Sequence, residues 1–515
     1  MLRLLVPNDN PTSEPTIQLN GRHWEVIEVV EVESPSYVCI TYAWGHNVTT
    51  NVLYGGSNLM SSRIISVLET AIQALEDPNP ALWIDAFCLP PRGDPLRHDA
   101  IDQMGDIYLG ASKVIVVLSK DSGAFLKIAK HGIKGAAGVT HVPALKALDQ
   151  DEWVTRSWTY QEIANAKGWL FVAEGNGKET AVDGFALLNG LGNAKMAYRR
   201  HLAQGDDTVA AETQTRLQLP HADLLEEVLL ACVVGAPLEM SALQVMSNVN
   251  RRIQEREEDY FNAMLGAIVR SKESTSIRLD WKIMAESALV KELENQLQFK
   301  DNREGSVVDE ILRPLKVAYA ANRFMQACER KSDYSFIYTT AKRSELDGQG
   351  WRPVPEILRP VCGWHSYGAS QRGEIHHGRL ELQDMFPTQA GNLTASAERF
   401  ITTWVQIFFP AESDSHSVEK VRLCLRQVGF SPSDESQRPF VLKDGYFFPQ
   451  WSVDFSDQLK VYLSSSIRWN FGAPAICVDE SGDLQNGGKF VSPGVFIGDV
   501  FAIARNTEKR RISLI

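Results

Sequence analysis

The chain has 515 residues, of which 52 are Lys or Arg and 64 are Asp or Glu, so its formal net charge is −12. A negative charge of this size argues against nucleic-acid binding through bulk electrostatics. Hydrophobic residues make up 44% of the chain and charged residues 23%, a composition that excludes global disorder. At roughly 100–200 residues per domain, the length predicts about two to four domains.

The first third of the chain alternates short apolar runs with segments of helical spacing, as a parallel α/β sheet requires. The predicted strands, in chain order, cover residues 24–32, 37–43, 81–88, 113–119 and 168–173. The predicted helices cover residues 61–75, 100–109 and 157–167, the first with Ser61 or Ser62 as its N-cap. The run at 113–119 is rich in β-branched residues and has no polar alternation, which is typical of a central parallel strand.

Residues 120–152 contain Gly132, Gly135 and Gly138 and are predicted to form a long irregular connection. Beyond residue 205 the apolar residues take helical spacing. The segments with this pattern are 221–234, 243–253, 260–269 and 307–328.

Beyond residue 331 the pattern becomes β-rich, in aromatic and β-branched runs at 334–340, 440–448, 459–464 and 494–504. Exposed loops are predicted at 342–350 and 411–417. The expected organisation is therefore an N-terminal lead (1–34), an α/β domain (35–200), a helical region (205–330) and a mostly β C-terminal region (331–515).

The seven cysteines form no C-x-x-C pair and have no regular spacing, so they indicate reduced thiols rather than a disulfide framework or a zinc site. The N-terminus lacks a secretory apolar core, and the longest apolar candidate, 224–238, contains Glu226 and Glu227 and is too short to span a membrane. We expect a soluble cytoplasmic protein without a membrane span.

Ligands of open parallel sheets bind beyond the carboxyl ends of the strands. This rule selects four places in the sequence: residues 42–46, residues 85–88, residues 119–121 and the segment before the helix at Ser157.

The same places carry a family resemblance. The blocks are YVCITYAWG at 37–45, LWIDAFC at 82–88, MGDIY at 104–108 followed by Ala111, and RSWTYQE at 156–162. In order and spacing they resemble the blocks of the heterokaryon-incompatibility (HET) domain, known mainly from filamentous fungi. The resemblance covers residues 35–175, and residues 256–266 resemble a block that often follows. Thr41 replaces a usual serine, and 90–92 occupies a loop where a glutamine is common, which affects loop detail more than the fold.

HET domains are similar to the Toll/interleukin-receptor (TIR) superfamily, so the resemblance implies a flavodoxin-like parallel sheet. It places Trp158 and Glu162 where catalytically active TIR domains carry a tryptophan and an essential glutamate. It therefore implies Glu162 as the catalytic residue of an NAD glycohydrolase, with NAD as substrate and no cofactor or metal. Nicotinamide in NAD is a cationic leaving group, so one carboxylate near the oxocarbenium-like ribose is chemically sufficient. The binding residues implied beside it are Trp44, Gly45, Asp85, Ser119 and Trp158.

Each of these residues also has a structural interpretation. Glu162 could be a solvated residue of a surface helix, and Trp158 and Trp44 could be core packing. Asp85 ends an apolar strand and needs a partner because an unpaired buried carboxylate is costly, and a backbone turn or Arg92 could supply it.

Other signals are weak. Cys88 has no matching histidine for a nucleophile pair, and His376-His377 is the only adjacent histidine pair, which gives little support for a metal. Gly190-Leu-Gly192 lacks the third glycine of a dinucleotide fingerprint and is expected in a loop.

The leading hypothesis is a HET-domain protein of the cell-death type whose N-terminal domain hydrolyses the N-glycosidic bond of NAD or a related nucleotide. A homo-oligomer is expected, because a shallow site at strand ends can be completed by a neighbouring subunit, and the C-terminal region could hold a protein partner. The rival hypothesis is a non-catalytic assembly module with homotypic contacts. A third is a nucleotide-processing enzyme with another substrate.

Overall fold

The computed structural model divides the chain into two compact units. Unit 1 comprises Met1–Pro237 with Arg252–Gln254 and Val269–Lys272, and unit 2 comprises Leu238–Arg251, Glu255–Ile268 and Glu273–Ile515. The structure describes residues 2–9, 16–29, 36–56, 58–77, 80–91, 94, 96–132, 141–202, 215–233, 240–254, 256–268, 305–346, 349–409, 417–454, 456–481 and 487–515.

Unit 1 is built on an eight-stranded sheet with the order β10-β9-β8-β4-β7-β1-β3-β2. Its four middle strands are parallel: β4 (Tyr37–Tyr42), β7 (Ala81–Trp83), β8 (Lys113–Leu118) and β9 (Trp169–Ala173). The antiparallel strands at the two edges are β10 (Val182–Asp183), β1 (Leu2–Asn8), β3 (Arg22–Val29) and β2 (Ile17–Leu19).

The prediction that residues 113–119 form a central parallel strand is confirmed. β8 lies between β4 and β9 and pairs in parallel with both. Every residue of β8 after Lys113 is buried, as expected for a strand covered on both faces.

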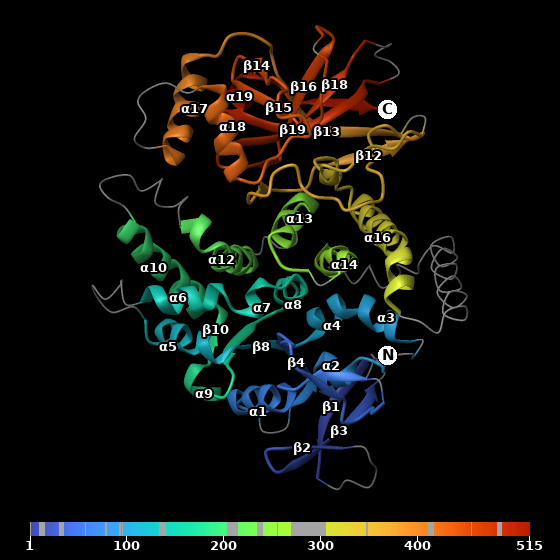
Figure 1. Cartoon of the computed structure of the whole chain (residues 1–515), viewed down its shortest axis with the longest axis vertical. Coiled ribbons are helices and arrows are strands. Elements are labelled where there is room, and N and C mark those ends of the chain that lie inside the picture. The colour runs from blue at the N-terminus through green and yellow to red at the C-terminus, as the bar shows by residue number, and fades with distance from the viewer. Residues whose placement is uncertain are drawn as a thin grey trace. The chain divides into compact units, whose positions relative to one another are not determined.

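Helices cover both faces of this sheet. Figure 1 shows α1 (Ile64–Ala74) and α9 (Gly177–Thr180) on one side, and α4 (Met104–Gly110), α7 (Glu152–Thr155) and α8 (Thr159–Ala164) on the other. The other helices described in unit 1 are α2 (Asp85–Cys88), α3 (Leu96–Asp102), η2 (Lys120–Ser122), α5 (Gly123–His131), α6 (Val142–Asp149), α10 (Gly184–Leu202) and α12 (Pro220–Val233).

Three sequence predictions in this unit are wrong. The N-terminal lead (1–34), in which a strand is predicted only at 24–32, also contains β1, whose apolar side chains Leu4 and Leu5 are fully buried. The strand predicted at 81–88 stops at Trp83, and residues 85–88 form α2. The described parts of the predicted irregular connection, 120–132 and 141–152, are mainly helical. The buried side chains Phe125, Leu126 and Ala129 give α5 an apolar face, although Gly132 and its neighbours suggest a loop.

Two smaller expectations also differ. α1 begins at Ile64 after Arg63, and neither Ser61 nor Ser62 caps it; the Ser61 hydroxyl donates instead to the Trp44 carbonyl. Gly190 lies inside α10 rather than in a loop. A Cβ there would lie 2.7 Å from the Ala129 Cβ, so glycine permits α10 to approach α5 closely. Gly135 and Gly138 lie outside the described residues.

Unit 2 begins with helices, as the spacing predicts: α13 (Ala242–Asn250), α14 (Glu257–Ile268) and α16 (Gly305–Arg330). Three further helices lie near the C-terminal sheet: α17 (Ala395–Phe408), α18 (Val418–Gln427) and α19 (Val500–Asn506). The run at 334–340, predicted as a strand, contains the 3₁₀ turn η6 (Ser335–Ile337), since the Asp333 carboxylate accepts from the Ser335 amide and turns the backbone.

The C-terminal region is mostly β, as predicted. Its sheet has the order β12-β13-β16-β18-β19-β15-β14, with β20 paired to β13. The strands are β12 (Gly373–His376), β13 (Arg379–Pro387), β14 (Phe440–Leu442), β15 (Gly445–Pro449), β16 (Leu459–Ser464), β18 (Gly472–Asp479), β19 (Lys489–Gly498) and β20 (Arg510–Leu514), and β11 (Tyr367–Gly368) pairs separately with β17 (Ile467–Arg468).

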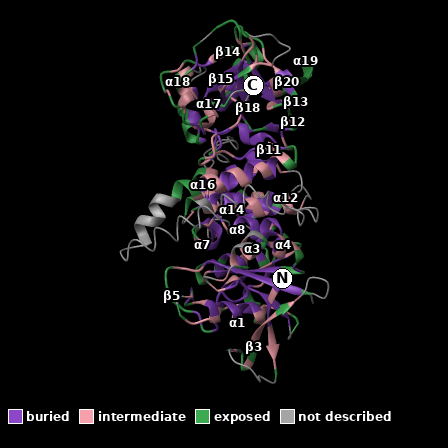
Figure 2. Ribbon diagram, turned by 90° about the vertical axis from the view of Figure 1, so that its right-hand side faces the viewer, coloured by how far each residue is buried: buried purple, intermediate pink, exposed green. Residues whose placement is uncertain are grey.

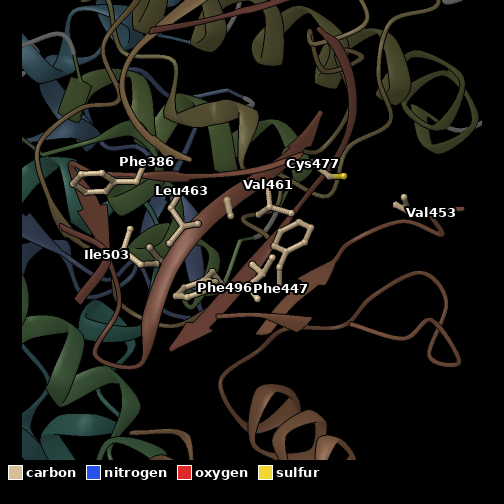
Figure 3. Close-up of a cluster of buried hydrophobic side chains, with 11 residues drawn as sticks. Phe386, Phe447, Val453, Val461, Leu463, Cys477, Phe496 and Ile503 are labelled. Atoms are coloured by element: carbon tan, nitrogen blue, oxygen red, sulfur yellow. The ribbon is translucent and has the colours of Figure 1, made fainter. Parts of the chain in front are cut away.

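Apolar side chains from this sheet and α19 form the core of the region. Figure 3 shows Leu463, Phe447 and Phe496 meeting within it, and all three are fully buried. Figure 2 shows buried residues running through the sheets of both units. Of the predicted exposed loops, residues 411–416 lie outside the described chain. No helix among the described residues is both long and apolar enough to cross a lipid bilayer.

Candidate functional site

The strand order creates a divergence point in the sheet of unit 1. From β4 the chain moves to β7 on one side, and then returns to β8 on the other side of β4. The loops that follow β4 and β8 therefore run apart, which opens a crevice at the carboxyl ends of these two strands. A cavity of about 920 Å³ lies there, between Ala43 and Gly45 after β4 and Val117 and Ser119 at the end of β8. This volume is within the range of small-molecule sites.

Gly45 shapes the rim of this cavity. Its backbone has a φ of +72°, a conformation that is strained for any residue with a side chain. A Cβ at this position would lie 3.7 Å from the Arg63 Cδ and 3.9 Å from the Glu152 Oε2. Without a side chain at this position, the backbone of Gly45 can approach a ligand closely, which is compatible with its prediction as a binding residue.

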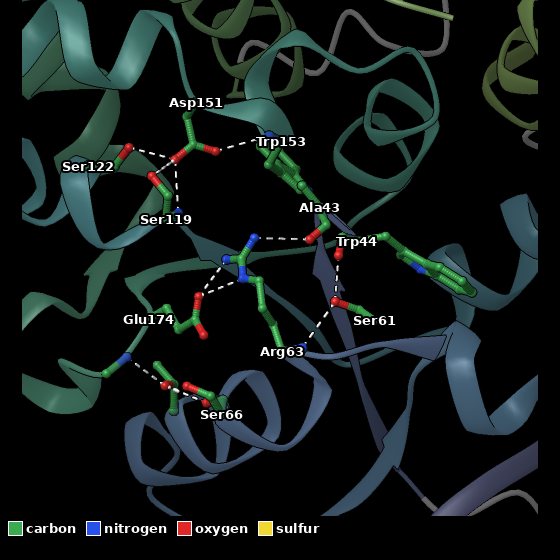
Figure 4. Close-up of polar contacts among 12 residues, drawn as sticks. Ala43, Trp44, Ser61, Arg63, Ser66, Ser119, Ser122, Asp151, Trp153 and Glu174 are labelled. Atoms are coloured by element: carbon green, nitrogen blue, oxygen red, sulfur yellow. Dashed lines mark hydrogen bonds and ion pairs between the residues drawn. The ribbon is translucent and has the colours of Figure 1, made fainter. Parts of the chain in front are cut away.

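Asp151 organises the wall formed after β8 (Figure 4). Its Oδ2 accepts hydrogen bonds from the Ser119 amide at 2.9 Å and from the hydroxyls of Ser119 and Ser122, both at 2.7 Å. Its Oδ1 accepts from the Trp153 amide at 3.0 Å and caps α7. Four donors therefore stabilise this carboxylate, and the Ser119 hydroxyl is already engaged by it.

Arg63 crosses the cavity from the start of α1 to the end of β9. Figure 4 shows its guanidinium between Ala43 and Glu174. Its Nε and Nη2 donate to the Glu174 Oε2 at 2.8 and 2.5 Å, and its Nη1 donates to the Ala43 carbonyl at 3.3 Å. The Glu174 side chain is only 10% exposed, so this ion pair is shielded from solvent.

A second polar cluster lies at the same end of the sheet and contains Glu162. The Thr41 hydroxyl, on β4, donates to the Glu162 Oε2 and accepts from the Trp153 Nε1 at 2.6 Å. Burial raises the pKa of Glu162 to about 7, and the charge of Asp85 adds to the increase, while the hydrogen bond from Thr41 opposes it. Carboxyl groups with strongly raised pKa values cluster at functional sites, so Glu162 is a candidate functional residue.

Asp85 is the other carboxyl of this cluster. Its Oδ2 accepts from the Trp44 Nε1 and its Oδ1 from the Ala86 amide, both at 2.7 Å. Burial raises its pKa, and these hydrogen bonds lower it. The prediction that Asp85 needs a partner is confirmed, with Trp44 and its own backbone turn in that role; Arg92 lies outside the described residues.

Tyr42 lies at the end of β4 and is 6% exposed. Its hydroxyl is buried and has no hydrogen-bond partner among the described residues. Burial raises the pKa of Tyr42 well above its usual value, and the charge of Asp85 raises it further, so the hydroxyl keeps its proton. A buried hydroxyl without a partner is rare in folded proteins and calls for an explanation.

The structure therefore brings some predicted residues together and separates others. Gly45 and Ser119 line the cavity, whereas Trp44 and Asp85 hydrogen-bond to one another beside it. Glu162 does not line the cavity and is 9% exposed, so the interpretation of a solvated surface glutamate is wrong. Trp158 is half-buried at the N-cap of α8.

Sequence reasoning missed Arg63, Asp151 and Glu152, which line the cavity, and the unpartnered hydroxyl of Tyr42. Asp151 has a local signal, since aspartate is a favoured N-cap residue, but the glycines in residues 120–152 predict an irregular connection there. Arg63 has no local signal, because its partner Glu174 is far away in the sequence.

Cys88 is not an activated nucleophile in this structure. Burial raises the pKa of its thiol to about 12, and its Sγ accepts from the Ile84 amide at 3.4 Å. Within the described ranges, no group of three or more His, Cys, Asp or Glu side chains is placed to hold a metal ion.

Fold and site together define a mixed α/β protein with a ligand-sized cavity at the divergence point of a parallel sheet. Residues 37–162 match the family model described as heterokaryon incompatibility protein (HET). The matched segment runs from β4 to α8 and includes Trp44, Gly45, Asp85, Ser119 and Glu162. Neither a curated protein nor a solved structure matches the chain. The HET segment indicates a protein of the heterokaryon-incompatibility type.

Proposed function

We propose that unit 1 binds NAD or a related nucleotide at the carboxyl ends of β4 and β8 and hydrolyses its N-glycosidic bond, with Glu162 as the catalytic carboxylate. The observation that supports this proposal most is the buried carboxyl pair of Glu162 and Asp85 at the end of the sheet where the 920 Å³ cavity opens. Trp44 and Asp85 border the reacting ribose, and Gly45 and Ser119 border the pyridinium ring that is joined to it.

The topology supports the wider relationship to TIR domains that the sequence resemblance implies. In chain order the parallel strands are β4, β7, β8 and β9, and their spatial order is β7-β4-β8-β9. This is the 2-1-3-4 order of flavodoxin-like sheets, in which the ligand binds at the carboxyl ends of the first and third strands. Here those strands are β4 and β8.

The proposed reaction is chemically balanced with one carboxylate and water. The C1′–N bond breaks and its electron pair goes to the pyridinium nitrogen, which becomes neutral. Water adds its oxygen to C1′ and releases one proton. Positive charge develops on the ribose meanwhile, and an ionised Glu162 supplies the opposite charge in a site of low dielectric.

The pKa and the burial of Glu162 set two conditions for this role. With a pKa of about 7, Glu162 is about half ionised at pH 7. Because the side chain is only 9% exposed, the substrate must displace a neighbouring side chain to reach it. The proposal therefore requires activity to rise with pH as Glu162 ionises.

A second candidate function is non-catalytic assembly through homotypic contacts. The observation that favours it is a hairpin of β5 (Val48–Thr50) and β6 (Leu59–Ser61), which follows β4 and exposes apolar side chains. Val48 is 50% exposed and Val52 is 56% exposed. In this alternative the hairpin would contact a second copy, and Glu162 would serve only to hold Thr41. A homo-oligomer and a protein partner bound through residues 331–515 belong to either proposal.

Release of nicotinamide from NAD by the purified full chain tests the first proposal. The assay uses dilute protein and protein held together by a crosslinked tag, because activity could depend on assembly. The matched control for Glu162→Gln is Glu179→Gln, which changes an exposed glutamate of α9 that pairs only with Lys127 among the described contacts.

Loss of at least a hundredfold in rate in Glu162→Gln, with Glu179→Gln unchanged, is the expected result. Absence of release in both states of assembly refutes hydrolysis of NAD. Release that persists at full rate in Glu162→Gln refutes the assignment of Glu162 alone. Assembly without any hydrolysis favours the second candidate.

A further inference from the structure

The charges that line the cavity bear on which end of the ligand it accepts. Resting on the proposed function, we propose that the cavity admits the positively charged, phosphate-free end of the substrate, a ribose joined to a pyridinium ring, and that it disfavours phosphate. A ribosylated pyridinium without any phosphate, such as nicotinamide riboside, would then be a sufficient ligand.

The lining is predominantly acidic. Among the described residues, the cavity is lined by three carboxylates, Asp121, Asp151 and Glu152, and by one cationic side chain, Arg63. Because Glu174 pairs with Arg63, the charge of that cation is already compensated. A phosphate placed in the cavity would therefore meet an excess of like charge, whereas a pyridinium would meet opposite charge.

Arg63 is poorly placed to bind a phosphate. Three of its N–H groups are engaged, two by the Glu174 Oε2 and one by the Ala43 carbonyl. Two N–H groups remain, one on each Nη, but the charge behind them is already compensated by the Glu174 carboxylate, whose side chain is 10% exposed. A phosphate that met these two donors would gain little net attraction from Arg63, because attraction from a guanidinium depends on its uncompensated charge.

The acidic side chains differ in what they can offer a ligand. Both oxygens of Asp151 already accept protein hydrogen bonds. Glu152 is 42% exposed and its Oε1 lies 3.4 Å from the Nε2 of His46, a side chain that is 97% exposed. Its Oε2 lies beside Gly45 at the cavity rim. Glu152 can thus accept hydrogen bonds from the hydroxyls of a ribose.

The hydroxyl of Tyr42 is an independent observation that points to a ligand. It is buried, keeps its proton and has no partner among the described residues. Tyr42 is the register partner of Val117, and Val117 lines the cavity. A ribose hydroxyl that entered between the cavity and the Glu162–Asp85 pair would provide the missing hydrogen bond, and a phosphate there would lie close to two carboxyl groups.

Calorimetric binding to the full chain carrying Glu162→Gln tests this inference, because that variant keeps the cavity while slowing turnover. The probes are nicotinamide riboside and nicotinamide mononucleotide, which differ only by one phosphate. We expect the riboside to bind at least tenfold more tightly. Adding Asp121→Asn or Glu152→Gln should weaken binding of the riboside and strengthen binding of the mononucleotide. The dissociation constant of the mononucleotide divided by that of the riboside should therefore fall at least fivefold.

The ratio is the decisive readout, because damage to the fold would weaken both ligands together. Glu179→Gln changes a side chain that does not line the cavity and should leave the ratio unchanged. Equal or tighter binding of the mononucleotide, a ratio that neither cavity variant alters, or no binding of either ligand overturns the inference.

The inference and the proposed function fail in distinguishable ways. If the riboside binds preferentially but the unmodified chain never releases nicotinamide, the proposed function fails and the charge selection stands. If NAD is hydrolysed but the mononucleotide binds as well as the riboside, the function stands and the charge selection fails.

Discussion

Glu162→Gln should change the stability of unit 1 in a pH-dependent way. The pKa of Glu162 is about 7 in the folded chain and 4.5 in an unfolded one. The folded state therefore binds more protons than the unfolded state between these values, and stability falls as the pH rises through this window. The stability that comes from the proton on Glu162 is fully present below about pH 4.5 and is lost as the pH passes about 7.

The magnitude follows from the same two values. At about 1.4 kcal/mol per pH unit, the interval from 4.5 to about 7 corresponds to about 3 kcal/mol of destabilisation above pH 7. Glutamine cannot ionise and keeps an oxygen that can accept from the Thr41 hydroxyl. We therefore expect Glu162→Gln to be more stable than the unmodified chain by about 3 kcal/mol at pH 8, and nearly equal to it at pH 4.5.

Urea unfolding monitored by pulsed hydrogen exchange and mass spectrometry measures this difference. Peptides that contain β4 and α8 report on unit 1 separately from unit 2. The reasoning is refuted if Glu162→Gln is the less stable chain at pH 8, or if the difference does not change between pH 4.5 and pH 8. A variant that gains stability while losing nicotinamide release would identify Glu162 as a residue kept for function at a cost in stability.

Three other substitutions test neighbouring features. Asp151→Asn should cost unit 1 about 2–4 kcal/mol in urea unfolding, because both carboxylate oxygens accept hydrogen bonds and an amide nitrogen would face a donor; a loss below about 1 kcal/mol would contradict this. Tyr42→Phe should leave stability unchanged or raise it by up to about 1 kcal/mol, since its hydroxyl has no described partner, yet weaken nicotinamide riboside several-fold in calorimetry; a clear loss of stability would reveal a structural partner. In unit 2, Arg343→Lys should lower the free energy of unfolding by about 2–4 kcal/mol, measured as hydrogen-exchange protection of peptides from β19. The buried guanidinium lies 4.9 and 4.8 Å from the ring centres of Trp451 and Phe490, and it donates to backbone carbonyls that an ammonium cannot reach together. Unchanged protection would refute this role.

Local pattern predicted much of the fold. The β-branched run of β8 and the 3/4 spacing of apolar residues in α1, α13 and α16 predict these elements correctly. The burial of one or both faces of an element determines which of its neighbouring residues are apolar, so the pattern can be recognised locally. The predictions failed where a local signal conflicted with tertiary contacts. The glycines near α5 obscured its apolar face, and aromatic residues at 334–340 suggested a strand where Asp333 enforces a turn.

The candidate site was only partly predictable. The sequence alone placed Trp44, Gly45, Asp85 and Ser119 at strand ends, since each follows a recognisable apolar run. It gave no sign that Trp44 and Asp85 hydrogen-bond to each other, or that Glu162 is buried rather than solvated. Burial on a helix depends on what covers it, and α8 is covered by α4 and α12 as well as β4.

Sequence by itself determined the kinds of elements, their order, and the chemistry available at the strand ends. Only the tertiary structure decided which of those ends are neighbours. Placing β8 beside β4 opens the cavity, and the same order joins Arg63 to Glu174 and Thr41 to Glu162 across more than a hundred residues. Periodicity reports the environment of each segment but carries no information about which segment lies next to it, so the cavity and its charge arise from the assembled sheet.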